Sequence, residues 1–128
     1  MNTNRFVPFT VFLLRIAASI VLVLPGTMKL FGWFGGMPGG GPLPPLMLVA
    51  GILEVVGGVL IMLGFLTRPV AFILSGEMAV AYFMGHFPSG FWPIQNHGEA
   101  AMLLSFIFLF LASFGAGSLS IDAFLKKS

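Results

Sequence analysis

The sequence contains no cysteine and very few charged residues. Without cysteine, this chain cannot form disulfides, ligate an iron–sulfur cluster, attach a c-type haem or use a thiolate nucleophile. Only 8% of its 128 residues are charged and 58% are hydrophobic, whereas about a quarter of the residues of a soluble domain are charged. The net charge is only +2, and the cations form no basic face that would bind nucleic acid. The composition therefore indicates a protein that lies in a lipid bilayer.

Four apolar segments fill most of the chain and predict membrane-spanning helices over about residues 7–31, 44–66, 69–85 and 96–114. A run of about 20 apolar residues can cross the hydrocarbon core of a bilayer. A cleaved signal peptide is the alternative for the first segment, but Arg15 interrupts it and the PGTM sequence that follows is not a small-x-small cleavage site. Short connections favour an all-α protein, an integral membrane antiparallel four-helix bundle that forms a single domain over residues 1–128.

The connections and helix ends have their own signals. Residues 32–45 are rich in glycine and proline but lack the lysine and the strand–helix context of a phosphate-binding loop, so we expect a plain connection. Asn96 is a predicted N-cap of the last span, with Glu99 three residues later as in a capping box. The Gly-Ala-Gly sequence at 115–117 should end that span, and a short surface helix should begin at residues 120–122.

The distribution of cations predicts the orientation in the membrane. Four spans place both termini on one side, together with Arg5, Arg68, Lys126 and Lys127. Lys29 lies towards the other side, where it could form an interfacial pair with Glu99 or bind a ligand. Since lysine and arginine are enriched in cytoplasmic segments, we expect both termini in the cytoplasm.

Three ionisable residues lie near the middle of the predicted spans. Arg15, Glu54 and Glu77 each follow roughly nine or ten helical residues, which places them near mid-depth. A charge at the bilayer centre costs at least about 2.5 kcal/mol, so these side chains should point inward and compensate one another. We expect Arg15 to pair with Glu54, because a guanidinium fits a carboxylate, and Glu77 to be a second partner or a protonated acid. This intramembrane charge network either clamps the helices or carries protons.

The connection between the third and fourth spans concentrates polar and aromatic residues. Residues 86–99 hold both histidines of the chain, and two prolines prevent one regular helix. His97 and Glu99 are candidate proton-transfer residues, since histidine titrates near neutral pH. His86, Trp92 and Asn96, with Lys29 from the first span, are candidate ligand-binding residues. The two histidines and Glu99 could also ligate a metal, but they lie on opposite sides of a loop, and we expect no metal site.

Short motifs along the chain resemble those of the DoxX family. They are an arginine at position 15, GTMKL at 26–30, GILEVVGG at 51–58, LGFLTR at 63–68, His86 before a Phe-Trp-Pro segment, NHGE at 96–99 and GAGSLSID at 115–122. They follow one another in the order and spacing of the family and cover the chain from about Arg15 to Asp122.

The resemblance implies a bacterial inner-membrane protein with four helices. By motif match, it carries functional positions over to Arg15, Lys29, Glu54, His86, Asn96 and Glu99. The wider group includes DoxD-like subunits linked to thiosulfate oxidation with quinone as acceptor, and DoxX members are linked to membrane oxidoreductase assemblies. The implied function is a redox-associated subunit that binds a quinone or similar lipophile in the outer half of the bundle. A partner oxidoreductase or a soluble donor would supply the electrons, because this chain holds no electron carrier.

Two other functions stay open at this point. A non-catalytic scaffold or assembly factor would recruit partner proteins and would not need the polar residues of the outer loop. A small transporter or proton path would use Arg15, Glu54 and Glu77, and it would require a homo-oligomer, since four spans form a pore only by assembling. Whether the chain is an enzyme, and which cofactor it uses if not a quinone, also stays open.

Overall fold

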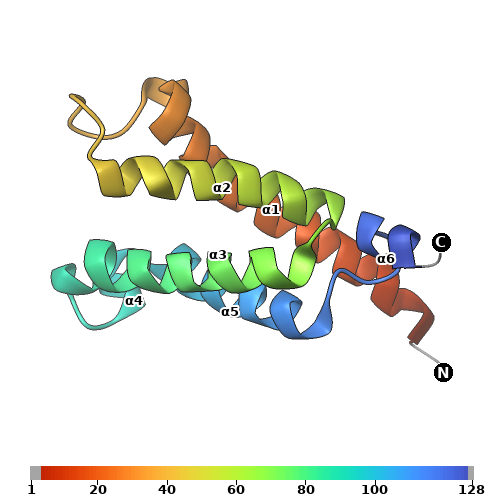
Figure 1. Cartoon of the computed structure of the whole chain (residues 1–128). Coiled ribbons are helices and arrows are strands. Elements are labelled where there is room, and N and C mark those ends of the chain that lie inside the picture. The colour runs from red at the N-terminus through yellow and green to blue at the C-terminus, as the bar shows by residue number, and fades with distance from the viewer. Residues whose placement is uncertain (1–3, 127–128) are drawn as a thin grey trace. The chain divides into compact units, whose positions relative to one another are not determined.

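A computed structural model describes residues 4–126 of the chain (Figure 1). Residues 1–3 and 127–128 lie outside the described residues, and Lys127 of the predicted cytoplasmic charge cluster is one of them. The long helices are α1 (Val7–Phe31), α2 (Pro45–Leu63), α3 (Thr67–Ala81) and α5 (Glu99–Phe114). Shorter elements are η1 (Asn4–Phe6), η2 (Trp33–Gly35), η3 (Tyr82–His86), η4 (Phe87–Ser89), α4 (Pro93–Asn96) and α6 (Ile121–Lys126). The described part contains no strand, which confirms the all-α class.

Three helical segments are long and apolar enough to cross a membrane. They are Asn4–Phe31, Pro45–Leu63 and Thr67–Ser89, with mean hydropathies of 2.4, 2.5 and 1.4. The fourth apolar helix, α5, has 16 residues, a length of about 24 Å at 1.5 Å per residue. The residues described thus hold three to four helices that could cross a membrane, and the antiparallel four-helix arrangement stays a prediction.

Backbone conformation determines where α1, α2 and α3 begin and end. Gly32 and Gly64 follow α1 and α2 in the left-handed conformation, each with φ of 69°, which is the usual glycine stop of a helix. Hence α2 ends three residues before the predicted end at residue 66. α3 begins at Thr67 rather than at Pro69, because a proline in the first helical turn needs no hydrogen-bonded N–H.

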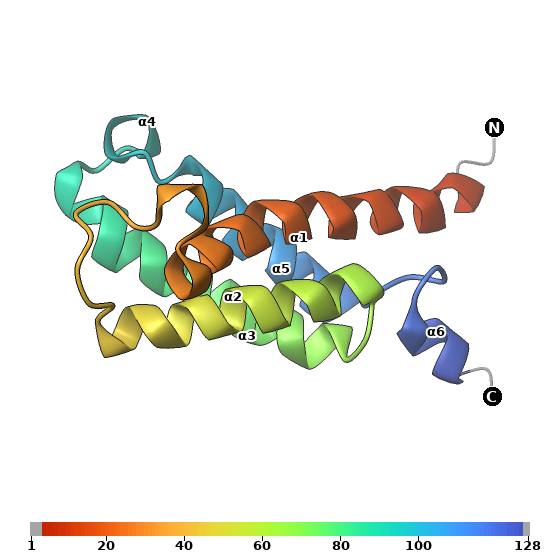
Figure 2. The same ribbon diagram turned by 90° about the horizontal axis from the view of Figure 1, so that it is seen from above.

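The chain divides into two compact units, which are described separately. One comprises Met1–Leu66 and Ala116–Ser128, and the other comprises Thr67–Gly115. The first contains the helix pair α1 and α2, and the second contains the pair α3 and α5; the members of each pair lie side by side in both views (Figures 1 and 2). The single domain over residues 1–128 stays a prediction.

In the first unit, glycines let α1 and α2 approach closely. A Cβ added to Gly26 would lie 2.9 Å from the Cβ of Glu54, and one added to Gly51 would lie 3.1 Å from the Cβ of Lys29. Residue numbers rise on one helix as they fall on the other, so the pair is antiparallel. Small residues at such a contact replace the side chains that would hold two helices apart.

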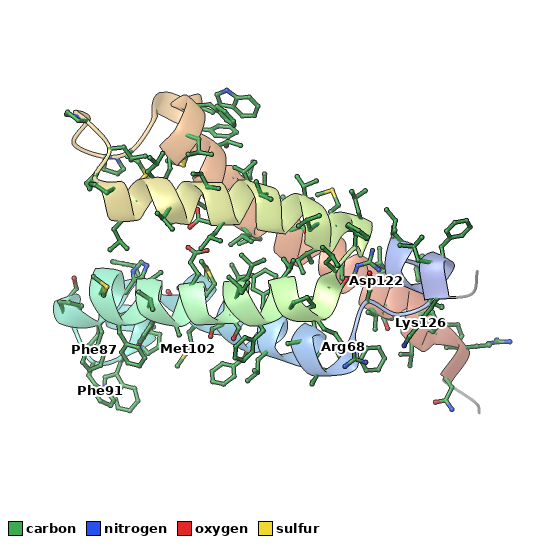
Figure 3. All side chains as sticks on the ribbon, viewed as in Figure 1. Arg68, Phe87, Phe91, Met102, Asp122 and Lys126 are labelled. Atoms are coloured by element: carbon green, nitrogen blue, oxygen red, sulfur yellow. The ribbon has the colours of Figure 1, made fainter. Side chains whose placement is uncertain are left out.

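In the second unit, polar contacts fix the register of α3 against α5. The Ser75 hydroxyl donates to the Ser105 carbonyl (2.7 Å), and the Ser105 hydroxyl donates to the Ser75 carbonyl (2.9 Å). At one end, the Arg68 guanidinium donates to the carbonyls of Ser113 and Phe114, the last two residues of α5 (Figure 3). The pair is therefore antiparallel, and a cation lies on the negative end of the α5 dipole.

The segment between α3 and α5 contains more helix than the predicted loop. α3 continues into η3, a five-residue π-helical turn, and η4 and α4 follow. The predicted N-cap role of Asn96 is wrong: Asn96 ends α4, and Gly98 precedes the first residue of α5. The Asn96 side chain instead accepts a hydrogen bond from the Gly98 N–H (2.8 Å), which turns the chain between the two helices.

Candidate functional site: a buried lysine–glutamate pair beside a cavity

A buried ion pair joins α1 to α2. The Lys29 Nζ donates to Glu54 Oε1 at 2.7 Å, and the two side chains are 11% and 4% exposed. Lys29 belongs to the last turn of α1, where the helix dipole favours a cation. Glu54 lies nine residues after the first residue of α2, Pro45, at a depth of about 13 Å along the helix. The pair thus crosses the helix contact at a point that lipid and water hardly reach.

The glycines described above explain why the pair can form. Lys29 follows Gly26 by three residues, and Glu54 follows Gly51 by three. In the antiparallel contact, Glu54 lies against Gly26 and Lys29 lies against Gly51. Each charged side chain therefore starts opposite a glycine of the other helix, which leaves room for it. The Lys29 ammonium and the Glu54 carboxylate can then meet between the two helices.

Lys29 also lines a cavity of about 470 Å³ at the end of this helix pair. Met28 belongs to the same wall, Leu43 and Met47 supply apolar side chains, and glycines and prolines of residues 32–44 complete the lining. The volume lies within the range of about 300–1,000 Å³ that is typical of small-molecule sites. This part of the molecule is a partly open cavity lined by apolar residues, by glycine and proline, and by one charged side chain that can orient a ligand.

The predicted pairing of Arg15 with Glu54 is wrong. Arg15 is 1% exposed, and it donates four hydrogen bonds to backbone carbonyls. Two acceptors are in the last turn of α2, Ile61 (3.0 Å) and Met62 (2.9 Å). These carbonyls have no partner within their own helix and carry the negative end of its dipole, so they hold the guanidinium as a carboxylate would.

The other two acceptors of Arg15 belong to the C-terminal segment. They are the carbonyls of Ala116 (2.9 Å) and Leu119 (2.8 Å). Asp122 strengthens the same junction, because its carboxylate accepts from the Leu66 N–H (2.8 Å) and its N–H donates to the Gly64 carbonyl (2.9 Å). Arg15 and Asp122 therefore fasten the C-terminal segment to the end of the α1–α2 pair.

In the second unit, Asn96 organises the polar loop. It is 3% exposed, and its amide N–H groups donate to the Tyr82 hydroxyl (3.1 Å) and the Gly90 carbonyl (3.0 Å). The His86 Nδ1 donates to the Asn96 carbonyl at 3.1 Å. Since the polar groups of Asn96 are engaged within the protein, its observed role is to shape the loop.

The other candidates of the outer loop lie at the surface of the second unit. His97 is exposed and directly follows α4 with φ of 60°, Glu99 is the exposed first residue of α5, and Trp92 is 60% exposed. Trp92 belongs to a series of ring contacts through Phe91 and Phe87, with centroids 4.9 Å and 5.8 Å apart (Figure 3). Among residues 4–126, no three His, Asp or Glu side chains gather closely enough to hold a metal ion.

The structure groups some predicted site residues and leaves others apart. It brings Lys29 and Glu54 together, and it brings His86 to Asn96. These two groups belong to different units, so a single site containing both stays a prediction. Glu77 is half-buried in α3, and its part in a charge network also stays a prediction. Sequence reasoning missed the contribution of residues 32–44 to a cavity, although their proline and glycine content marked an irregular segment.

The apolar helices and the buried charged pair define a helical multi-pass membrane protein. Its family follows from comparison: the DoxX family model matches residues 10–87, more than half of the chain. The protein belongs to the DoxX family. The motifs at Arg15, Lys29 and Glu54 all fall within the matched region.

Three bacterial proteins are similar to this chain over most of their length. An uncharacterized protein of Haemophilus influenzae is 42% identical over 98% of this chain and 98% of its own. The inner membrane proteins YqjF and YphA of Escherichia coli are 32% and 28% identical, over 88% and 95% of this chain and 89% and 99% of their own. No solved structure matches the chain.

Proposed function

We propose that this protein is the membrane subunit of a redox-associated system and that it binds a quinone or similar lipophile in the cavity beside Lys29. The observation that carries the proposal is the state of the Lys29 ammonium. It is nearly buried, it lines the cavity, and its bond to Glu54 engages one of its three N–H donors. A bound oxygen that accepts from the remaining donors would complete its hydrogen bonding.

The charge of the pair favours a neutral acceptor over an anion. Lys29 is the charged residue among those that line the cavity, and Glu54 compensates it at 2.7 Å. A carboxylate or phosphate near Lys29 would also lie near the Glu54 carboxylate and be repelled by it, strongly so in a medium of low dielectric constant. A quinone carbonyl accepts the hydrogen bond without carrying a full charge.

The rest of the lining fits the apolar body of such a ligand. Met28, Leu43 and Met47 are apolar residues of the lining, and among the described residues Lys29 is its one charged member. Apolar walls with a few fixed polar groups are usual for sites that bind uncharged organic molecules. These features support a ring with carbonyl groups held at its polar edge by Lys29.

Reduction of a quinone consumes protons as well as electrons. The Lys29 ammonium carries the proton of the ion pair, so Lys29 is a candidate proton donor to a bound quinone, with the Glu54 carboxylate holding it in place. His97 and Glu99 are exposed residues of the other unit and stay candidates for proton transfer to solvent. A partner oxidoreductase or a soluble donor supplies the electrons, and a homo-oligomer is compatible with the small residues of α2.

We also propose that the protein resides in the bacterial inner membrane with both termini in the cytoplasm. The E. coli relatives YphA and YqjF are named inner membrane proteins. Four crossings would place Arg5, Arg68 and Lys126 on one side, and cytoplasmic segments are enriched in such cations.

The test of ligand binding is mass spectrometry of small lipophiles that co-purify with the detergent-extracted protein. We compare the natural chain with a Lys29→Leu, Glu54→Leu double variant, which removes both charges without leaving one buried alone. Glu99→Gln is the matched control, because it neutralises an exposed carboxylate that is not among the residues lining the cavity. We expect a quinone with the natural chain and with Glu99→Gln, and its loss from the folded double variant.

Equal amounts of quinone in all three samples would refute the site. If no sample retains a lipophile, titration with ubiquinone-1 tests the site directly. Equal affinity of the natural chain and the double variant for ubiquinone-1 would also refute the site. A stoichiometric protein partner in a preparation that neither retains nor binds a quinone would favour the scaffold function instead.

A further inference from the structure

Three of the eight methionines of the chain line one cavity. Met28 precedes Lys29 in the last turn of α1, Met37 lies in the glycine-rich connection, and Met47 is the third residue of α2. They come from three separate segments, so helical periodicity does not explain why they share a cavity. Methionine in a helix contact usually fills space, but here the three side chains border an open volume of about 470 Å³.

The chemistry of the lining selects one class of metal ion. The described residues that line the cavity are the three methionines, Leu43, Lys29 and several glycines and prolines, with no histidine, aspartate or glutamate among them. Hard ions such as Mg²⁺ require oxygen ligands, and Zn²⁺ prefers imidazole, thiolate or carboxylate. Thioethers are soft ligands that favour Cu(I) and its analogue Ag(I). We infer that Met28, Met37 and Met47 form a binding site for a soft monovalent cation, Cu(I) or Ag(I).

The surroundings suit a monovalent cation. The charge of Lys29 is compensated by Glu54 at 2.7 Å, so an ion in the cavity meets no net positive charge. Each methionine has three rotatable bonds, which allow the three sulfur atoms to adjust to one ion. Because the chain has no cysteine, methionine supplies its soft ligands. This site can be tested apart from the proposed quinone, since its ligands are methionine sulfur atoms, whereas the hydrogen-bond donor to the quinone is Lys29.

The test measures Ag(I) bound to the purified chain in detergent, by titration calorimetry and by metal analysis after desalting. The cavity variant is Met28→Leu, Met37→Leu, Met47→Leu. The matched control is Met62→Leu, Met84→Leu, Met102→Leu, which removes three sulfur atoms that do not line the cavity. Leucine preserves the apolar volume at each position, so both variants should fold.

We expect the natural chain and the control to bind one more equivalent of Ag(I) than the cavity variant, or to bind it at least tenfold more tightly. X-ray absorption at the silver edge should show sulfur neighbours. Equal binding by the cavity variant, or loss of the ion from the control or from a His86→Ala, His97→Ala variant alone, would overturn the inference. The folded Lys29→Leu, Glu54→Leu variant, which removes the proposed hydrogen-bond donor to the quinone, should still bind Ag(I), so failure of the quinone proposal and failure of this one give different results.

Discussion

Removal of Lys29 alone should destabilise the first unit strongly, whereas removal of both charges should not. In Lys29→Leu, the Glu54 carboxylate loses its partner but stays about 13 Å along the helix from the first residue of α2. The Glu54 side chain is only 4% exposed in the natural chain. Breaking one side of a buried pair costs about 3–5 kcal/mol, and replacing both partners with apolar residues is often neutral. We therefore expect about 3 kcal/mol of lost unfolding free energy for Lys29→Leu and less than about 1 kcal/mol for the double variant.

The other single variant should be milder, and the asymmetry follows from the geometry. Lys29 is two residues from the end of α1 and is 11% exposed, so its long side chain can turn towards the interface when Glu54 is replaced. Glu54 is shorter and farther from a helix end, and it has no such route. For Glu54→Leu we expect a loss of about 1–2 kcal/mol, roughly half the effect of Lys29→Leu.

The assay is equilibrium unfolding in mixed detergent micelles, followed by tryptophan fluorescence. The chain has two tryptophans, one in each unit, so a Trp92→Phe background lets Trp33 report on the unit that holds the pair. Trp92 is 60% exposed, and its replacement should matter little. If the losses of the two single variants add up in the double variant, the two charges do not compensate each other and the reasoning is refuted.

Three further substitutions test the other contacts. Gly51→Ala should cost about 1–3 kcal/mol in the same unfolding assay, because the new Cβ would lie 2.9 Å from the Leu30 side chain, whereas Gly76→Ala, which meets nothing within 4 Å, should be neutral or slightly stabilising. Arg15→Lys should cost about 2–4 kcal/mol by the same measurement, since a lysine cannot reproduce four hydrogen bonds from one planar fork. Asn96→Ala should increase hydrogen exchange by residues 82–98 at least tenfold, which corresponds to about 1.4 kcal/mol, and unchanged exchange there would contradict its role in the loop.

The sequence predicted the helical class and the depth of the charged residues but not their partners. Counting residues from the start of each predicted span gives the depth of a side chain in the membrane. By this count, Arg15 and Glu54 lie at the same depth. Arg15 binds backbone carbonyls, and because every residue has a carbonyl, no pattern of residue types can predict which ones it binds. The pairing of Lys29 with Glu54 had a usable signal, the repeated spacing of a glycine three residues before each charge.

Helix ends were predicted well where one residue controls the backbone and poorly where tertiary contacts compete. Gly115 ends α5 as expected. Asparagine is a frequent N-cap residue, but the Asn96 side chain forms hydrogen bonds with Tyr82, Gly90 and Gly98 instead. Those partners lie up to 14 residues away, and a local capping rule cannot include them.

Arg15 and Lys29 differ in how many of their hydrogen-bond donors are used within the protein, and this difference favours Lys29 for the candidate site. Both are buried cations of α1, and both belong to motifs of the family resemblance. Arg15 uses four of its five N–H donors on backbone carbonyls, so little capacity is left for a ligand. Lys29 uses one of three on Glu54 and borders a cavity. Arg15 therefore joins segments of the chain, and Lys29, in the last turn of the same helix, is the better candidate to hold a bound molecule.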